Sequence, residues 1–248
     1  MQTIEPGWTA PSRVRAAFTL RAGGTSVGPY ASLNVGAHVG DAPAAVRGNR
    51  RLLEEWLLLP AEPVWLQQVH GVAVLDLDAD SQPPVGASAD AAVTRAPGRV
   101  CVIQVADCMP VLFAARDGSA VGAAHAGWRG LAGGVLEATV RKLGVAPDQL
   151  LAWLGPAISQ EHFEVGDDVR DAFVSHDPSA APAFVANPRG RWQCNLYALA
   201  RRRLAALGVR DVSGGGWCTF ADAARFFSYR RDGQCGRMAA LIWMTPPA

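Results

Sequence analysis

Short apolar runs, separated by glycine, proline and polar residues, make up much of the first half of the chain. Each run has about the length of a strand, and several are continuously apolar, which is typical of strands buried on both faces. The pattern predicts strands at residues 14–20, 64–69, 72–77, 89–94, 100–105, 111–115 and 120–124.

Longer segments between and after these runs have the caps of helices. Asp41 is placed to cap a helix at 41–58, while Asn195 and Gly208 suit the two ends of a helix at 196–207. Two more helices are predicted at 128–143 and 167–175, and turn-forming residues predict loops at 81–87 and 179–191.

Groups of strands between separated helices favour an α+β fold rather than a regular doubly wound sheet. The chain has 248 residues, half of them apolar, which is enough for one large core. It shows no internal repeat and no segment with the composition of a domain linker. We therefore predict a single domain that spans residues 1–248.

Candidate chemistry gathers at three strand ends. His70, Cys108 and His125 each follow an apolar run and precede a residue that breaks a strand. Cysteine and histidine are the preferred ligands of zinc, and three protein ligands with one open position are typical of a catalytic zinc site. The spacing alone is weak evidence for a metal site. Cys108 also fits an ordinary buried thiol, and each histidine also fits a core or loop side chain.

The motifs around these residues resemble the YfiH/YlmD family, also called the laccase-domain or multicopper polyphenol oxidase family. The resemblance runs from about residue 18 to residue 243 and rests on HVGDAPAAVRGNR, QQVHG, ADCMPVLF, AAHAGWRG and RFFSYRRDGQCGRMAALIW. It implies mixed sheets layered between helices, an αββα sandwich, with zinc bound by His70, Cys108 and His125. It also implies phosphorolysis of adenosine, inosine, guanosine and methylthioadenosine, adenosine deamination, and for some members a role in peptidoglycan editing.

The chain departs from that family at two places. Many members have a cysteine within the segment that corresponds to 155–162, where this chain has none, and Val105 replaces a common threonine. His162-Phe163-Glu164 matches the His-x-Glu of nucleobase deaminases, but the Pro-Cys-x-x-Cys that accompanies it is absent, so we interpret the match as accidental.

Several residues are candidates for substrate binding. Arg129, at the start of a predicted helix, is placed to bind phosphate, and Arg230 lies among aromatic residues that would stack on a purine. Asn34 and His38 are further candidates. Asp107 is the candidate carboxylate for orienting a ligand or transferring a proton. Each residue also has a purely structural interpretation. The arginines would be solvated, the aromatic residues would fill the core, Asn34 and His38 would lie in a turn, and Asp107 would cap a turn.

In the proposed phosphorolysis, zinc stabilises charge while phosphate is positioned against C1′ of the ribose and the purine leaves. In the proposed deamination, the same zinc activates water for attack at C6 of adenine. A multicopper oxidase is disfavoured, because the chain has 5 histidines whereas four coppers need about ten. Copper can still replace zinc at such a site.

Composition limits which partners and which cellular location the sequence favours. A net charge of +1 with dispersed basic residues disfavours nucleic acid, and no run is long enough to cross a membrane. The amino terminus does not have the pattern of a signal peptide, and an odd number of cysteines, 5, argues against a disulfide framework. We expect a cytoplasmic protein, a monomer or weak homodimer.

Two other readings of the same three residues stay open. The first is a cysteine hydrolase or editing factor acting on peptidoglycan precursors, with Cys108 as nucleophile and His125 or His70 as base. The second is a zinc ion that is purely structural. Tight zinc binding would exclude the first, and nucleoside turnover that survives loss of zinc would favour the second.

Overall fold

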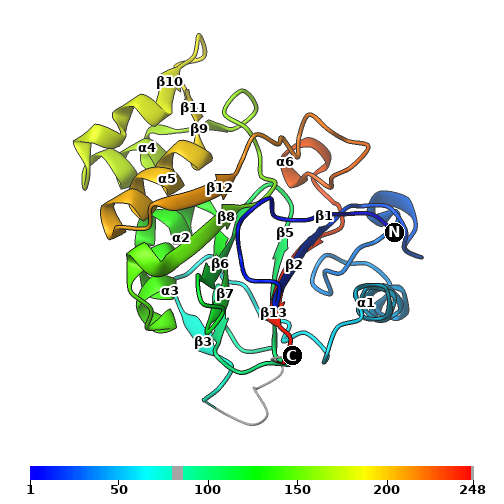
Figure 1. Ribbon diagram of the computed structural model, residues 1–248. Coiled ribbons are helices and arrows are strands. Elements are labelled where there is room, and N and C mark those ends of the chain that lie inside the picture. The colour runs from blue at the N-terminus through cyan, green and yellow to red at the C-terminus, as the bar shows by residue number, and fades with distance from the viewer. Residues whose placement is uncertain (80–85, 247–248) are drawn as a thin grey trace.

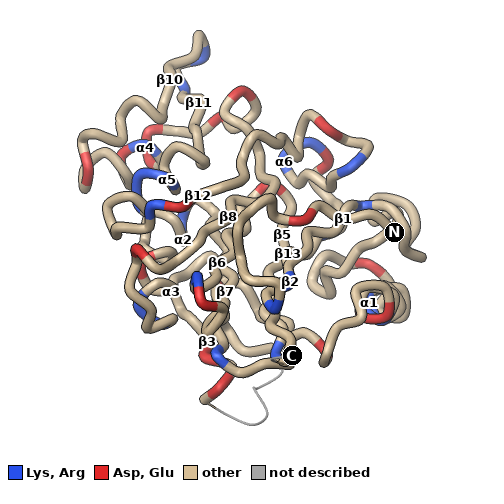
Figure 2. The backbone as a smooth tube through the Cα atoms, in the orientation of Figure 1, with Lys and Arg blue, Asp and Glu red and all other residues tan. Residues whose placement is uncertain are grey.

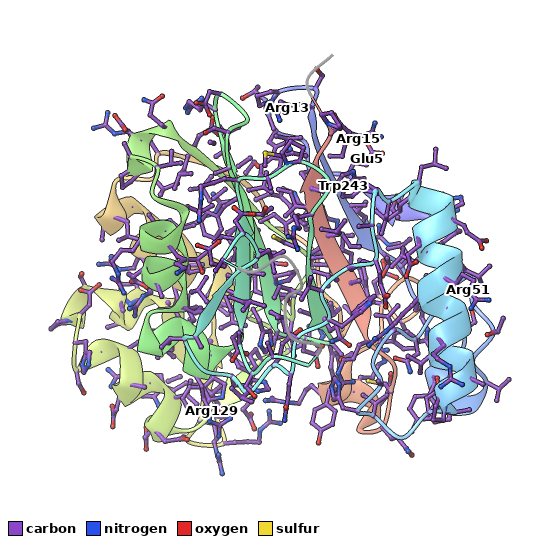
Figure 3. All side chains as sticks on the ribbon, turned by 90° about the horizontal axis from the view of Figure 1, so that it is seen from below. Glu5, Arg13, Arg15, Arg51, Arg129 and Trp243 are labelled. Carbon is purple, nitrogen blue, oxygen red and sulfur yellow. The ribbon has the colours of Figure 1, made fainter. Side chains whose placement is uncertain are left out.

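Two β-sheets lie face to face between helices in the computed structural model (Figure 1), which describes residues 1–79 and 86–246. Figure 3 shows these layers from below: α1 (Pro43–Leu57) covers the outer face of one sheet, and α3 (Val135–Leu143) lies on the far side of the other. The predicted α+β fold with sheets layered between helices is confirmed.

The larger sheet has six strands in the order β12-β8-β6-β7-β4-β3. The outer pairs β12–β8 and β3–β4 are parallel, and the central pairs are antiparallel. Its strands are β3 (Val74–Asp76), β4 (Ala91–Thr94), β6 (Met109–Ala115), β7 (Val121–Ala126), β8 (Leu150–Leu154) and β12 (Asp211–Gly214).

The second sheet has four antiparallel strands in the order β1-β2-β13-β5. They are β1 (Thr3–Ile4), β2 (Val14–Thr19), β5 (Val100–Val105) and β13 (Met238–Met244), so the carboxy-terminal strand lies between two strands from the first half of the chain. A smaller sheet, in the order β10-β11-β9, contains β9 (Glu164–Val165), β10 (Phe184–Ala186) and β11 (Trp192–Cys194).

Continuously apolar strands lie between two layers because each of their faces is buried. On β6, Val111 and Phe113 pack toward the helices, whereas Leu112 packs into the core between the sheets. On β13, Ile242 belongs to the core between the sheets and Leu241 packs with residues of α1. Side chains alternate along a strand, so only an uninterrupted apolar run satisfies both environments.

The helices lie outside the sheets. Besides α1 and α3 they are α2 (Trp128–Gly133), α4 (Asp167–Val174), α5 (Leu196–Leu207) and the single turn α6 (Tyr229–Asp232), with 3-10 turns η1 (Gly28–Tyr30), η2 (Pro147–Gln149) and η3 (Pro178–Ala183). Charged residues of both signs are spread over these elements (Figure 2). Within the described residues, no helix is both long and apolar enough to span a membrane.

The predicted strands at 14–20, 72–77, 89–94, 100–105, 111–115 and 120–124 all correspond to observed strands, with shifted ends at most of them. The strand predicted at 64–69 is wrong: this segment makes only isolated bridges, from Val64 to Cys101 and from Gln67 to Ser88. Strands β8, β12 and β13 were not anticipated, although each pairs along much of its length with a neighbour.

The predicted helix at 128–143 is two helices, because Gly134 has a φ of 101° and ends α2 before α3 begins. The helix at 196–207 is confirmed with both caps, since the Asn195 side chain accepts from Ala198 N–H and Gly208 is left-handed. Asp41 is not the N-cap of α1; Ala42 is, and the Asp41 carboxylate instead accepts from Ser26 and Asn34.

The loop predicted at 179–191 is partly wrong, because it contains most of η3 and all of β10, which pairs with β11. The helix at 167–175 is confirmed as α4. Of the loop predicted at 81–87, residues 81–85 lie outside the described residues.

Candidate metal centre and its two pockets

Three potential metal ligands converge where the six-stranded sheet ends. One ligand atom from each of His70, Cys108 and His125 lies within 4.8 Å of the others, and Cys108 Sγ is 3.8 Å from His70 Nε2. Cys108 directly precedes β6 and His125 lies near the end of β7. Pairing of these strands sets Met109 opposite Ala126, which brings the thiol and the imidazole together from opposite chain directions.

A buried carboxylate that the motifs did not indicate holds both histidines. Asp90 Oδ1 is 2.8 Å from His125 Nδ1 and also accepts from His70 N–H at 2.9 Å. Asp90 Oδ2 accepts from the N–H groups of Val69 and Gly71, at 3.1 and 2.7 Å. Asp90 therefore fixes one ligand through its ring and the other through the backbone around it.

The space among the three ligands exists because residue 127 is glycine. A Cβ atom at Gly127 would lie 2.9 Å from Cys108 Sγ, 3.1 Å from His70 Cδ2 and 3.6 Å from His125 Nε2. The backbone of Gly127 is extended, with a φ of −63°, so the chain conformation alone does not require glycine. Glycine is required by the open volume at the centre of the ligand group, which consists of His70, Cys108 and His125.

The charges of the group reinforce one another. Burial opposes ionisation of Cys108, but the neighbouring His125 and His70 outweigh it and lower the thiol pKa to about 6. Burial likewise opposes protonation of His125, yet Cys108 and Asp90 raise its pKa to about 9. Burial would raise the pKa of Asp90, and the hydrogen bonds from His125, Gly71 and Val69 lower it overall. Without a metal, the site thus favours a Cys108 thiolate beside a protonated His125.

The donor set and its spacing fit a zinc ion. Zinc takes thiolate sulfur at about 2.3 Å and imidazole nitrogen at about 2.0–2.1 Å, so tetrahedral geometry separates the two donor atoms by about 3.6 Å. The observed separation of Cys108 Sγ and His70 Nε2, 3.8 Å, is close to this value. Hydrogen bonding from His125 Nδ1 to Asp90 leaves Nε2 as the free nitrogen for a metal.

Two neighbouring cavities are lined by members of the His70–Cys108–His125 group. The larger, about 430 Å³, has a polar wall that includes His38, Gln68, Gln104 and Arg237. The smaller, about 230 Å³, has an apolar and aromatic wall that includes Trp128, Ile158, Phe163 and Leu196. Both cavities share the lining residues His70, Ala106, Cys108, Arg129 and Tyr229.

Comparison with known proteins identifies the family. The family model described as multi-copper polyphenol oxidoreductase laccase matches residues 15–245. The chain belongs to this family. The predicted YfiH/YlmD resemblance is thereby confirmed.

Relatives in this laccase-domain family match nearly the whole chain. A protein of Pseudomonas aeruginosa named as a purine nucleoside phosphorylase is 56% identical, with coverage of 97% of this chain and 98% of the relative. The Escherichia coli protein named purine nucleoside phosphorylase YfiH is 49% identical, with the same coverage of 97% and 98%.

Solved structures agree with this assignment. A Neisseria meningitidis protein is 47% identical with a TM-score of 0.95, over 99% of this chain and 100% of that one. YlmD from Geobacillus stearothermophilus is 34% identical with a TM-score of 0.89, over 95% and 93%. The laccase-domain fold therefore extends over nearly the full chain.

Two of the predicted binding residues of this laccase-domain chain, Arg129 and His38, line the larger cavity. The guanidinium of Arg129 lies 4.4 Å from the centre of the Trp128 ring. Arg129 is at the lower edge of the molecule in Figure 3, and within the described residues its guanidinium has no hydrogen bond or ion pair. His38 lines the larger cavity, and burial together with Arg237 and Arg50 lowers its pKa. Its imidazole is therefore neutral at neutral pH.

Arg230 lines the smaller cavity. Its guanidinium donates to the Glu164 carbonyl at 2.8 Å and lies 5.3 Å from the Phe163 ring. The segment 226–232 is not one aromatic wall, because Phe226 and Phe227 are fully buried in the core between the sheets, whereas Tyr229 is exposed and lines both cavities.

Asn34 lies behind the cavities, with all of its polar atoms engaged. Its Oδ1 accepts from the N–H groups of Gly36 and Arg237, and its Nδ2 donates to Gly36 and Asp41. An amide can make about four hydrogen bonds, so none remains for a ligand. Asn34 supports the cavity wall by holding the backbone of Arg237.

Asp107 directly precedes Cys108, but its carboxylate is hydrogen-bonded to groups outside the ligand group. Its Oδ1 accepts from the Thr219 hydroxyl at 2.6 Å and its Oδ2 accepts from Arg230 N–H at 2.7 Å. The carboxylate that orients a ligand histidine is Asp90, not Asp107. A single Asp at the start of an apolar strand was the only sequence signal for Asp90.

Proposed function

We propose that this protein is a zinc-dependent purine nucleoside phosphorylase that converts adenosine, inosine, guanosine and methylthioadenosine to free base and ribose 1-phosphate, with adenosine deamination as a second activity. The observation that carries this proposal is that His70 and Cys108, two members of the His70–Cys108–His125 group, line both a polar cavity and an aromatic one. The names of the relatives support the same substrate class.

The two cavities suit the two ends of the reaction. Arg129, free of other partners within the described residues, is placed to bind phosphate from the polar side. On the other side, Trp128, Phe163 and Tyr229 present aromatic surface that can stack on a purine. The ribose of such a nucleoside would then lie across the ligand group.

His70, Cys108 and His125 would hold the metal, and Asp90 would fix the orientation of both histidines. When bound, zinc supplies positive charge that stabilises the developing anion and activates water. Copper can take the place of zinc at a site of this composition. Asp107 holds the start of α6 through Arg230 N–H and thereby positions the aromatic cavity wall.

Turnover of adenosine tests the proposal. The metal-quantified protein is incubated with adenosine, with and without phosphate, and adenine, inosine and ribose 1-phosphate are followed by chromatography. We expect phosphate-dependent release of adenine, and inosine formation that does not need phosphate. Both should disappear in Cys108→Ala and persist in Cys218→Ser, which changes a thiol outside the ligand group.

A metal-bound protein that releases neither base nor inosine would contradict the proposal. Loss of activity in Cys218→Ser equal to that in Cys108→Ala would also contradict it, because the effect would then not be specific to the ligand group. Nucleoside turnover that survives removal of the metal would assign the zinc a structural role.

The second candidate is a cysteine hydrolase or editing factor that acts on peptidoglycan precursors. The lowered pKa of Cys108, about 6, favours it, because a thiolate beside two imidazoles is also the arrangement of a cysteine nucleophile. The two candidates require opposite states of the sulfur. Stoichiometric metal that protects Cys108 from alkylation supports the phosphorylase; a metal-free protein whose hydrolysis of peptidoglycan precursors is lost on alkylation supports the hydrolase.

A further inference from the structure

A cysteine and a histidine that the proposed function does not use lie together beside the smaller cavity. Cys218 Sγ is 3.5 Å from His162 Nδ1, and the His162 ring stacks on Phe220 with ring centres 4.6 Å apart. Both Cys218 and His162 are half-buried, so a small reagent can reach the pair. His162 is next to Phe163, which lines the cavity.

Two backbone groups also point at the sulfur. The N–H groups of Ser159 and Ala221 both donate to Cys218 Sγ at 3.4 Å. Together with the imidazole, they surround one sulfur with three groups that stabilise negative charge. A cysteine with no chemical role does not require such a set of donors, because its sulfur packs as an apolar atom.

Two side chains lie beside His162 Nδ1, the nitrogen that would receive the thiol proton. Cys218 Sγ is 3.5 Å from it and Ser159 Oγ is 3.3 Å from it. In the tautomer that leaves Nδ1 unprotonated, this nitrogen can accept the proton of Cys218.

The other cysteines are unsuitable as reactive thiols. Cys101, Cys194 and Cys235 are buried, and burial raises the pKa of each. Cys108 belongs to the ligand group and is occupied when metal is bound. Cys218 is therefore the one partly exposed cysteine that remains accessible in the metal-bound protein.

We propose that Cys218, paired with His162, is a thiol modification site that forms a mixed disulfide with low-molecular-weight disulfides. The thiol proton passes to His162 Nδ1 as the sulfur attacks one sulfur of the disulfide. A new S–S bond forms, the old S–S bond breaks, and the leaving thiolate takes the proton from His162. The protein thiol is oxidised and half of the reagent disulfide is reduced to free thiol, so no other oxidant is needed.

An adduct at Cys218 also reaches the metal centre. Thr219 follows Cys218 directly, donates to Asp107 Oδ1 at 2.6 Å and is itself held by Ala157 O at 3.1 Å. Asp107 precedes the ligand Cys108. Added bulk at Cys218 would displace this short connection, so the modified protein should lose its metal faster.

Glutathione disulfide is the probe. The metal-loaded protein is treated with it, the adduct is located by peptide mass mapping, and the rate is followed by intact mass. We expect the adduct on Cys218, its absence in Cys218→Ser, and a rate that falls at least about tenfold in His162→Gln. His176→Gln, which changes an exposed histidine elsewhere, should react like the unmodified sequence.

A second variant covers a failure of His162→Gln to fold. His162→Asn also removes the ring nitrogen that faces Cys218 Sγ at 3.5 Å, so it should slow the reaction to the same extent. Modification of Cys108 or of a buried cysteine ahead of Cys218 would overturn the proposal. Equal rates in the folded His162→Gln variant and the original protein would also overturn it.

The link to the metal centre has its own readout. Release of metal to a chelator is compared before and after modification, with disulfide-treated Cys218→Ser as the matched control. Faster release that a reducing agent reverses supports the link, and equal release rates overturn it. Neither result depends on nucleoside turnover, so it is separate from the test of the proposed function.

Discussion

At the scale of single residues, the candidate metal centre depends on contacts that the motifs do not contain. The motifs indicated the three ligands because each lies in a distinctive string at a strand end. The motifs did not indicate Asp90, because the role of Asp90 depends on the folded loop around His70. The φ of His70 is 60°, and the N–H groups of Val69, His70 and Gly71 all donate to the Asp90 carboxylate. A conformation of this kind leaves little trace in composition.

Asp90→Asn tests this arrangement. An amide in place of the carboxylate replaces one acceptor oxygen by a donor, which must face a backbone N–H or the His125 ring. We expect zinc affinity to fall about 10- to 100-fold, measured by competition with a chelator. The control Asp117→Asn changes an exposed turn and should keep full affinity. Undiminished affinity in Asp90→Asn would show that the loop around His70 is held by other contacts.

Gly127→Ala tests the space among the ligands. The added methyl group would lie 2.9 Å from Cys108 Sγ and 3.1 Å from His70 Cδ2, so a ligand must move away from the metal position. We expect bound zinc, measured by metal analysis after dialysis, to drop while the circular dichroism spectrum stays unchanged. Gly7→Ala is the control, since no atom lies within 4 Å of its added methyl group. Full zinc occupancy in Gly127→Ala would mean that the ligands need no such space.

At the scale of elements, the hydrophobic pattern predicts strands that are buried on both faces. It does not predict strands that depend on pairing with a strand from a distant part of the sequence. β5 was predicted at its observed bounds, Val100–Val105, because it is apolar at every position except Gln104. The segment 64–69 has a similar pattern but makes only isolated bridges, from Val64 to Cys101 of β5 and from Gln67 to Ser88. β12 was missed because its strand character comes from pairing with β8 rather than from its composition.

The break between α2 and α3 is an element-scale feature with a measurable energy. Gly134 has a φ of 101°, which an alanine adopts only at a cost of about 1–2 kcal/mol. Gly48 lies within α1, where alanine is favoured by about 0.5–1 kcal/mol, and its added methyl group would lie 3.7 Å from Thr25 Oγ1. In urea unfolding we expect Gly134→Ala to be less stable than the original protein and Gly48→Ala more stable. Changes of the same sign would contradict the assignment of these two backbone conformations.

At the scale of the whole molecule, the ligand group brings together parts of the chain that are far apart in sequence. The loop before β3, the start of β6 and the end of β7 meet at the three ligands, and the start of β4 supplies Asp90. The layered fold was predictable from the alternation of buried runs and helices. The two cavities were not, because their walls combine side chains from α2, α5, α6 and several loops.

Removal of the metal should therefore lower the stability of the whole molecule. A metal that binds only the folded state adds about 2.7 kcal/mol when its free concentration is 100 times its Kd, which corresponds to a rise of about 5–10 °C in Tm for a chain of this size. We expect calorimetry to show Tm rising with the logarithm of zinc concentration. Cys108→Ser should remove this dependence, because it replaces a thiolate ligand, while Cys218→Ser should retain it. The same rise in Cys108→Ser would place the bound metal elsewhere. A zinc-dependent Tm, together with nucleoside turnover that is lost on removal of zinc, would show that one ion serves both the fold and the chemistry.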